Sequence, residues 1–225
     1  GGYRMRAPRD PPPVRAPGPA RKGHSGGFCE GCRVGCGCAD GAPVGFPPMD
    51  LHELSELLAL PSLVSDLDAL EAAMVDVLRE ADTLDALVEP GIRVVTGGGK
   101  RLRPTLTIAA GAVGGAPANG HVTAAGVAVE LVQVGSLVHD DLMDHAKTRR
   151  GVETVNAREG LNWAILVGDY LLAVAGIQAA SVSADVAHSL ARTIADLAAG
   201  QGREVTRQGD PKRSVAEYEA SILGK

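Results

Sequence analysis

The sequence predicts an all-α fold, and three observations support this prediction. Hydrophobic residues make up 45% of the 225 residues but aromatic residues only 3%, a composition that favours closely packed helices over a β-sandwich. Apolar side chains recur at helical spacing from Leu63 to Val77. A long run from about residue 118 to Asp144 is apolar on most sides, as expected of a buried central helix.

The charge of the chain is unevenly distributed. The formal net charge is −5, and residues 1–48 hold seven Lys/Arg and three Asp/Glu, which leaves fifteen against twenty-four in residues 49–225. An acidic body argues against a general nucleic-acid surface. No secretory pattern follows the first residue, and the longest apolar stretch contains Asp169, which would cost about 2.5–3.5 kcal/mol in mid-membrane. We therefore expect a cytoplasmic protein without a transmembrane segment.

Residues 1–48 differ in composition from the rest of the chain. They contain nine of the fourteen Pro, eleven of the twenty-nine Gly and all four Cys, without apolar periodicity, which predicts a disordered leader. Four thiols between Cys29 and Cys38 allow zinc binding as an alternative, although a second Cys-x-x-Cys pair and apolar support are missing. Because the composition turns globular at Met49, we predict that the leader is not part of the native folded protein.

The segment from residue 49 to residue 115 is predicted to form helices around a basic turn. Ser62 can cap the first of them. A second, short helix is predicted from about Thr83, and Pro90-Gly91 is expected to interrupt or end it. A third helix is expected after the basic turn, with Pro104 in its first turn.

The basic turn carries a glycine run followed by cations. It is not a P-loop, because no Gly stands five residues before Gly99 and Arg101 occupies the place of the magnesium-binding Ser/Thr. Lys100 and Arg103 are three residues apart, so they can bind one anion together at the start of a helix. A solvated basic turn is the alternative interpretation.

An acidic cluster closes the long apolar helix. Asp140 and Asp144 are four residues apart and therefore share one helix face, with Asp141 beside them. Like charges at this spacing repel unless a cation lies between them, and oxygen ligands suit Mg²⁺. For an isolated pair a solvated helix end is the alternative, but burying the helix would make unpaired charges costly. Arg149 and Arg150 follow, and guanidinium groups bind phosphate oxygens directly.

The remaining chain continues the helical pattern. Helices are predicted over about 159–180 and 183–201, the second of them ending in residues 200–204. Residues 215–223 are predicted to begin a further helix, and the abrupt end at Lys225 suggests a C-terminally truncated sequence.

Several of these motifs occur together in one known family. The chain resembles the trans-isoprenyl diphosphate synthases over about residues 50–225. The matching stretches are Gly98-Gly99-Lys100-Arg101-Leu102-Arg103-Pro104, His139-Asp140-Asp141-Leu142-Met143-Asp144, Arg149-Arg150-Gly151, Gly168-Asp169-Tyr170-Leu171-Leu172, Gln201 with Glu204, and Gly224-Lys225. The resemblance implies an isoprenoid synthase-type helical bundle around a central cavity, of which residues 49–225 form the N-terminal portion. It also implies a Mg²⁺-dependent homodimeric prenyltransferase that condenses isopentenyl diphosphate head-to-tail with an allylic diphosphate.

The resemblance assigns roles to individual residues. Asp140 and Asp144 would bind Mg²⁺ with support from Asp141, and Arg149 and Lys225 would contact the allylic diphosphate. The pocket for isopentenyl diphosphate would consist of Lys100, Arg103, Arg150 and Gln133, the last at a position where many relatives carry His. His139 is interpreted as structural rather than as a base.

The residues before the acidic cluster predict the product length. In the resembled family the product grows beside this helix, and Gly135 and Ser136 are small enough to leave that path open. We expect a product of twenty carbons or more, which could reach a membrane.

Two rival functions and one departure follow from the same residues. A non-catalytic partner subunit is disfavoured by the intact acidic cluster, and a class I terpene cyclase by Lys100 and Arg103, which would serve a second diphosphate. The second Asp-rich motif of the resembled family does not occur in the sequence. We therefore expect the 225-residue polypeptide alone to be inactive.

Overall fold

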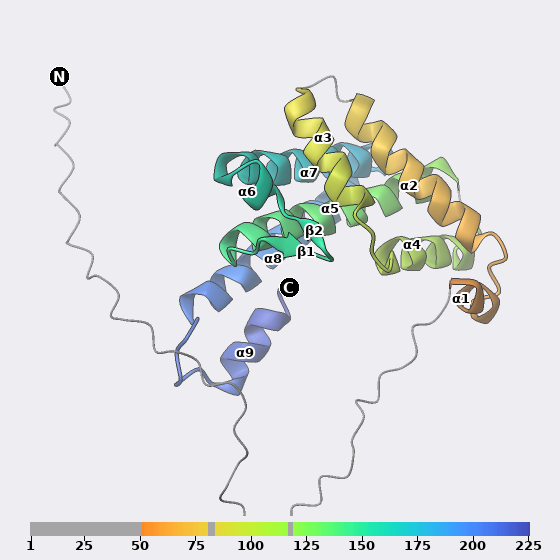
Figure 1. The fold of residues 1–225 in the computed structure, drawn as a ribbon. Coiled ribbons are helices and arrows are strands. Elements are labelled where there is room, and N and C mark those ends of the chain that lie inside the picture. The colour runs from red at the N-terminus through yellow and green to blue at the C-terminus, as the bar shows by residue number, and fades with distance from the viewer. Residues whose placement is uncertain (1–50, 81–83, 117–118) are drawn as a thin grey trace, which may run out of the picture. The chain divides into compact units, whose positions relative to one another are not determined.

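The computed structural model describes residues 51–80, 84–116 and 119–225, all of which belong to the unit Pro48–Lys225. These residues form nine helices and one short hairpin, which confirms the predicted all-α class (Figure 1). The predictions for residues 1–48, including the zinc alternative, and the helix start near Thr83 lie outside the described residues.

The elements follow one another in the order shown in Figure 1. They are α1 (Leu51–Leu57), α2 (Leu63–Glu80), α3 (Asp85–Thr96), α4 (Leu102–Val113), α5 (Gly120–Met143), β1 (Thr148–Arg149), β2 (Val152–Glu153), α6 (Val155–Arg158), α7 (Leu161–Val182), α8 (Ala184–Thr206) and α9 (Val215–Ile222). The two strands pair antiparallel, with Arg149 opposite Val152.

Helix α5 is the central element, as its apolar sequence predicts. It begins after Asn119, whose side chain accepts hydrogen bonds from the backbone N–H groups of His121 and Val122 at 3.0 and 3.1 Å. It packs mainly against α7, with α2, α3 and α4 on its other sides. Fixing α5 in this way fixes the position of the acidic cluster at its C-terminal end.

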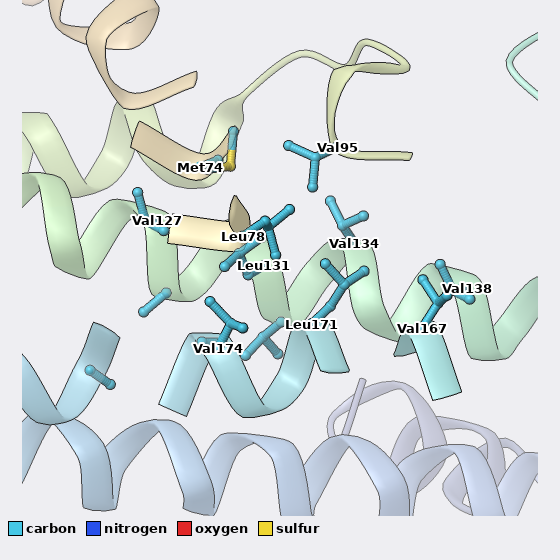
Figure 2. Close-up of a cluster of buried hydrophobic side chains, with 14 of the residues drawn as sticks. Met74, Leu78, Val95, Val127, Leu131, Val134, Val138, Val167, Leu171 and Val174 are labelled. Carbon is cyan, nitrogen blue, oxygen red and sulfur yellow. The ribbon is translucent and has the colours of Figure 1, made fainter. Parts of the chain in front are cut away.

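The core lies where α2, α3, α5 and α7 meet, and its side chains interdigitate in Figure 2. Fully buried side chains such as these contribute about 1.5–3 kcal/mol each. The largest come from all four helices and include Met74, Leu78, Val95, Leu131 and Leu171.

The prediction that Pro90-Gly91 interrupts or ends α3 is wrong. The helix continues through both residues to Thr96, and both are buried. Pro90 is the sixth residue of α3, so it removes only one bond of the helix ladder. A Cβ on Gly91 would lie 3.6 Å from Leu171, so α7 packs closely against the helix at this point and helps to hold it.

The prediction that α8 ends in residues 200–204 is also wrong, because the helix runs on to Thr206. Gly200 serves a close helix contact rather than a break. A Cβ on Gly200 would lie 2.8 Å from the carbonyl oxygen of Ser221 and 2.9 Å from the carbonyl carbon of Gly224. Helix α9, which starts with a capping box of Ser214 and Glu217, therefore lies with its C-terminal end against α8.

Two of the described helices, α5 and α7, are long and apolar enough to cross a membrane. Length and composition therefore do not confirm the expected absence of a transmembrane segment. The share of the apolar window that is buried is 56% in α5 and 33% in α7. More than half of this window is buried in α5, as in a core helix, and about a third of it in α7.

Candidate active site

The cationic residues predicted from separate parts of the sequence meet in one pocket. Lys100, Arg103, Gln133 and Arg150 line a cavity of about 470 Å³, together with Glu130. They come from the turn before α4, from α4 itself, from α5 and from the hairpin. Hereafter this cavity is called the cationic pocket. Arg101 lines it as well, so the lining offers three guanidinium groups and one ammonium group, which suit an anion with several oxygens.

The hairpin separates the two neighbouring arginines. Arg150 has a φ of 52° and is followed by Gly151 at 80°, so the chain turns sharply between β1 and β2. Arg150 thereby reaches Gly99, where an added Cβ would lie 2.7 Å from its Nη1 atom. The absence of a side chain at Gly99 lets the guanidinium group lie against the backbone at the rim of the cationic pocket.

This contact gives a prediction for Gly99→Ala. The added methyl group displaces the Arg150 guanidinium, and we expect the affinity for inorganic diphosphate to fall about fivefold, since bidentate charge-assisted contacts depend on geometry. Isothermal titration calorimetry measures this affinity. Gly98→Ala is the control, because it also places Ala at a positive φ but contacts nothing within 4 Å. Equal losses in both variants would show that turn strain, and not Arg150, is responsible.

Asp141 of the acidic cluster pairs with Arg149. Its side chain is only 6% exposed and accepts hydrogen bonds from Nε of Arg149 at 2.8 and 3.0 Å, while Nη2 lies 2.8 Å away. The hydrogen bond to Asp141 raises the pKa of Arg149. Asp141 therefore holds Arg149 in place.

Asp140 lies where a negative charge is unfavourable. Burial raises the pKa of its carboxyl group, and the charge of Asp144 adds to this effect, while Lys225 and Arg149 oppose it. A cation between Asp140 and Asp144 would relieve that repulsion. Within the described residues no three His, Cys, Asp or Glu side chains converge on one point. The two carboxylates thus fit a hard divalent cation that takes its other ligands from water and phosphate oxygens.

An apolar cavity of about 530 Å³ opens beside Asp140, between α5, α7 and α8. Hereafter it is called the apolar cavity. Ser136 lines it, as predicted, but Gly135 does not. A Cβ on Gly135 would lie 3.2 Å from the carbonyl oxygen of Gly168 and 3.3 Å from Cβ of Leu171, so Gly135 faces α7 instead. The remaining walls are mostly aliphatic and include Val132, Leu172, Ile194, Leu197 and Val205.

Lys225 lies in a further cavity of about 450 Å³, which Arg103 and Gln133 also line. Its Nζ atom donates a hydrogen bond of 2.6 Å to Glu204, which lowers the pKa of that carboxyl group. Because Gln133 lines both this cavity and the cationic pocket, the two are direct neighbours.

His139 links α5 to α7. Its Nε2 atom lies 3.3 Å from the carbonyl oxygen of Ile165 and 3.6 Å from Asp169. A Cβ on Gly168 would lie 2.1 Å from the same atom, so that glycine makes room for the ring. These contacts support the structural interpretation of His139.

The sequence interpretation missed the residues that support the basic turn. Arg101 is only 6% exposed and pairs with Glu71 and Glu130, which lie 30 and 29 residues away. Glu204, the partner of Lys225, was noted only as part of a motif. No local spacing signals such pairs, because the partners meet through the packing of different helices.

Comparisons with known proteins identify the family of this chain. Residues 85–225 match the polyprenyl synthetase family. The nonaprenyl diphosphate synthase of Mycobacterium tuberculosis is 38% identical over 141 residues, which are 63% of this chain and 42% of that protein. The octaprenyl diphosphate synthase of Escherichia coli is 30% identical over 178 residues, 79% of this chain and 53% of that protein.

A solved structure shares the fold. The polyprenyl synthase from Caulobacter crescentus, complexed with calcium and isoprenyl diphosphate, superimposes with a TM-score of 0.68 at 27% identity and covers 80% of this chain and 53% of that one. The chain thus spans about half the length of the relatives that it matches. Since the match to residues 85–225 extends over more than half of the sequence, the chain belongs to the polyprenyl synthetase family.

Proposed function

We propose that this chain is part of a Mg²⁺-dependent prenyltransferase that condenses isopentenyl diphosphate head-to-tail with an allylic diphosphate. The product is a polyprenyl diphosphate of twenty carbons or more. The observation that carries the proposal is the arrangement of the cavities. The cationic pocket adjoins the cavity of Lys225, and Asp140 stands at the apolar cavity beside them.

Each residue set suits one part of the reaction. Cleavage of the allylic C–O bond leaves negative charge on the departing diphosphate, which Arg149 and Lys225 stabilise. Magnesium ions held by Asp140 and Asp144 would supply further positive charge to that group. Lys100, Arg103 and Arg150 hold isopentenyl diphosphate, with Gln133 as a hydrogen-bond donor. The alkene of isopentenyl diphosphate attacks the allylic cation, and loss of a proton from the product cation restores the double bond.

Asp141 acts in this scheme through Arg149. Its buried carboxylate takes up Nε and one terminal nitrogen of the guanidinium group. The other N–H donors remain for phosphate oxygens, since a guanidinium group carries five. Asp141 is thus a positioning residue and not a metal ligand.

The exposed face of α7 supports a homodimer. Leu161, Ile165, Leu166 and Ile177 are 58, 41, 49 and 62% exposed on this helix. Leu161, Ile165 and Leu166 are grouped at the N-terminal end of the helix, and grouped exposed apolar side chains are typical of a protein–protein interface. A second copy of the chain is the partner we propose for it, and light scattering after size-exclusion chromatography measures the mass of the complex.

Binding experiments test the proposed function on the chain itself. We expect isopentenyl diphosphate to bind without Mg²⁺, a non-cleavable allylic diphosphate to require Mg²⁺, and the two to bind together. A terpene cyclase would bind the allylic analogue alone. We infer that the polypeptide of 225 residues does not catalyse the condensation, because it holds one acidic cluster. Detection of labelled product would contradict this inference.

A substitution at Ser136 tests the path of the prenyl chain. Ser136→Phe places an aromatic ring in the apolar cavity, so we expect the affinity for a twenty-carbon allylic analogue to fall about tenfold or more, while that for a five-carbon analogue changes less than about twofold. Titration calorimetry with both analogues measures the difference. Ser136→Ala is the matched control, since it removes the hydroxyl group without filling space. Equal losses for both analogues would exclude the apolar cavity as the site of the prenyl chain.

A further inference from the structure

Arg101 lies between Lys100 and Arg103 at the cationic pocket, but its guanidinium group is paired within the protein. Its side chain is only 6% exposed. Its Nε donates a hydrogen bond to Glu71 of α2, Nη1 to Glu130 of α5 at 3.0 Å, and Nη2 to the carbonyl oxygen of Val95 of α3 at 2.6 Å. Each nitrogen of the guanidinium group therefore has a protein partner on a different helix, although Arg101 is among the residues that line the cationic pocket.

The backbone of Arg101 is fixed as firmly as its side chain. Its φ is 45°, in the left-handed region that residues other than glycine rarely adopt. Its carbonyl oxygen accepts hydrogen bonds from the backbone N–H and, at 2.8 Å, from the hydroxyl group of buried Thr105. Lys100 and Arg103 stand one residue before and two residues after this anchor. Arg101 thus fixes the backbone from which both side chains extend.

Glu130 explains why an arginine is needed here. Its carboxylate lines the cationic pocket, where an unpaired negative charge would repel a diphosphate. Burial alone would lower the pKa of Arg101, but the hydrogen bonds to Glu71 and Glu130 raise it above its ordinary value, so the guanidinium stays charged. Arg101 therefore also neutralises the carboxylate of Glu130 in the lining of the cationic pocket.

We propose that Arg101 is a positioning residue that orients Lys100 and Arg103 in the cationic pocket and masks the charge of Glu130 toward isopentenyl diphosphate. The proposal rests on the proposed function, since it concerns the same pocket. Lysine cannot replace arginine in this role, because one ammonium group on a flexible stem cannot bridge acceptors on three helices.

The test compares variants of the whole chain by calorimetry with isopentenyl diphosphate, by thermal unfolding and by amide hydrogen exchange. For Arg101→Lys we expect an affinity for isopentenyl diphosphate about tenfold lower. Lys100 and Arg103 would be misplaced, and a misplacement of about 1 Å can cost up to about 100-fold. We also expect faster exchange confined to residues 97–104. Val127→Ala is the stability control, because Val127 is a buried core residue of α5 that lines none of these cavities. It should lower the melting temperature without changing the affinity.

Glu71→Gln provides a milder variant in case Arg101→Lys does not fold. Glu71 is half-exposed, and its loss leaves Arg101 with two partners, so we expect a two- to threefold lower affinity, in line with the loss of one exposed pair. If Arg101→Lys folds and its affinity is unchanged, the proposal is overturned. If Arg101→Lys does not fold, unchanged affinity in Glu71→Gln overturns it. An equal loss of affinity in Val127→Ala also overturns it. If the unmodified chain does not bind isopentenyl diphosphate, the proposed function fails. The anchoring role of Arg101 is then supported by faster exchange in residues 97–104 and overturned by unchanged exchange there.

Discussion

Replacing Asp140 by Asn should abolish the Mg²⁺-dependent part of allylic diphosphate binding while leaving the fold at least as stable. Loss of a direct metal ligand is expected to weaken binding at least about 100-fold, since even outer partners of ligands are worth 10–100-fold. Calorimetry with and without Mg²⁺ measures the effect. Asp196→Asn is the matched control, because Asp196 is an exposed carboxylate of α8 that pairs with Arg192 on the same helix.

The expected gain in stability follows from the direction of the Asp140 pKa. Because burial and Asp144 raise it, the folded chain holds this proton more tightly than the unfolded chain does. The resulting stability is present below the unfolded pKa and is lost as the pH rises through the folded pKa. At neutral pH the charged Asp140 therefore destabilises the metal-free chain, and Asn removes this effect. A lower melting temperature in Asp140→Asn would instead identify Asp140 as a structural residue.

Gly135→Val should lower the stability of the fold strongly and Ser136→Val hardly at all, although the two residues are neighbours on α5. Gly135→Val forces two methyl groups against α7, where a single Cβ already lies 3.2 to 3.3 Å from Gly168 and Leu171. We expect a loss of about 3 kcal/mol in the free energy of unfolding, or roughly 6–12 °C in melting temperature. Ser136→Val faces the apolar cavity and should change the stability by less than about 1 kcal/mol.

Thermal melts followed by far-UV circular dichroism measure both Gly135→Val and Ser136→Val. A melting temperature for Gly135→Val within about 2 °C of the unmodified chain would mean that α5 and α7 can separate at this point. The contact between them would then be looser than the structure indicates. The comparison of the two valine variants removes helix propensity as an explanation, since the new residue is the same in each.

The helices could be predicted from sequence wherever one periodic pattern dominated. The apolar run that became α5 and the helix predicted to begin at residue 215 are local signals, and both correspond to real elements within the described residues. Predictions based on glycine or proline as helix breakers failed. Pro90 and Gly200 lie inside helices because a neighbouring helix packs against each site, which no local pattern reveals.

The candidate site was predictable in its charges but not in their directions. The family resemblance assigned Lys100, Arg103, Arg150 and Gln133 to one pocket, and they do line one cavity. The pairing of Asp141 with Arg149 could not be predicted, because it depends on the course of the chain after α5. In the same way, Arg101 resembles its basic neighbours until its distant acidic partners are known.

The left-handed backbone conformation of Arg150 lowers the stability of the fold, while the side chain of Arg150 contributes a cation to the cationic pocket. A residue other than glycine in this conformation costs about 1 kcal/mol or more, and exposed Arg150 lies in it at a φ of 52°. Selection for heat resistance alone would favour glycine there and would remove a cation from the cationic pocket. At Arg101 the same backbone strain is offset by buried ion pairs, so that heat resistance and ligand binding favour the same residue. Thermostabilised variants of this chain should therefore be selected with Arg150 held constant, whereas Arg101 will be retained without such a constraint.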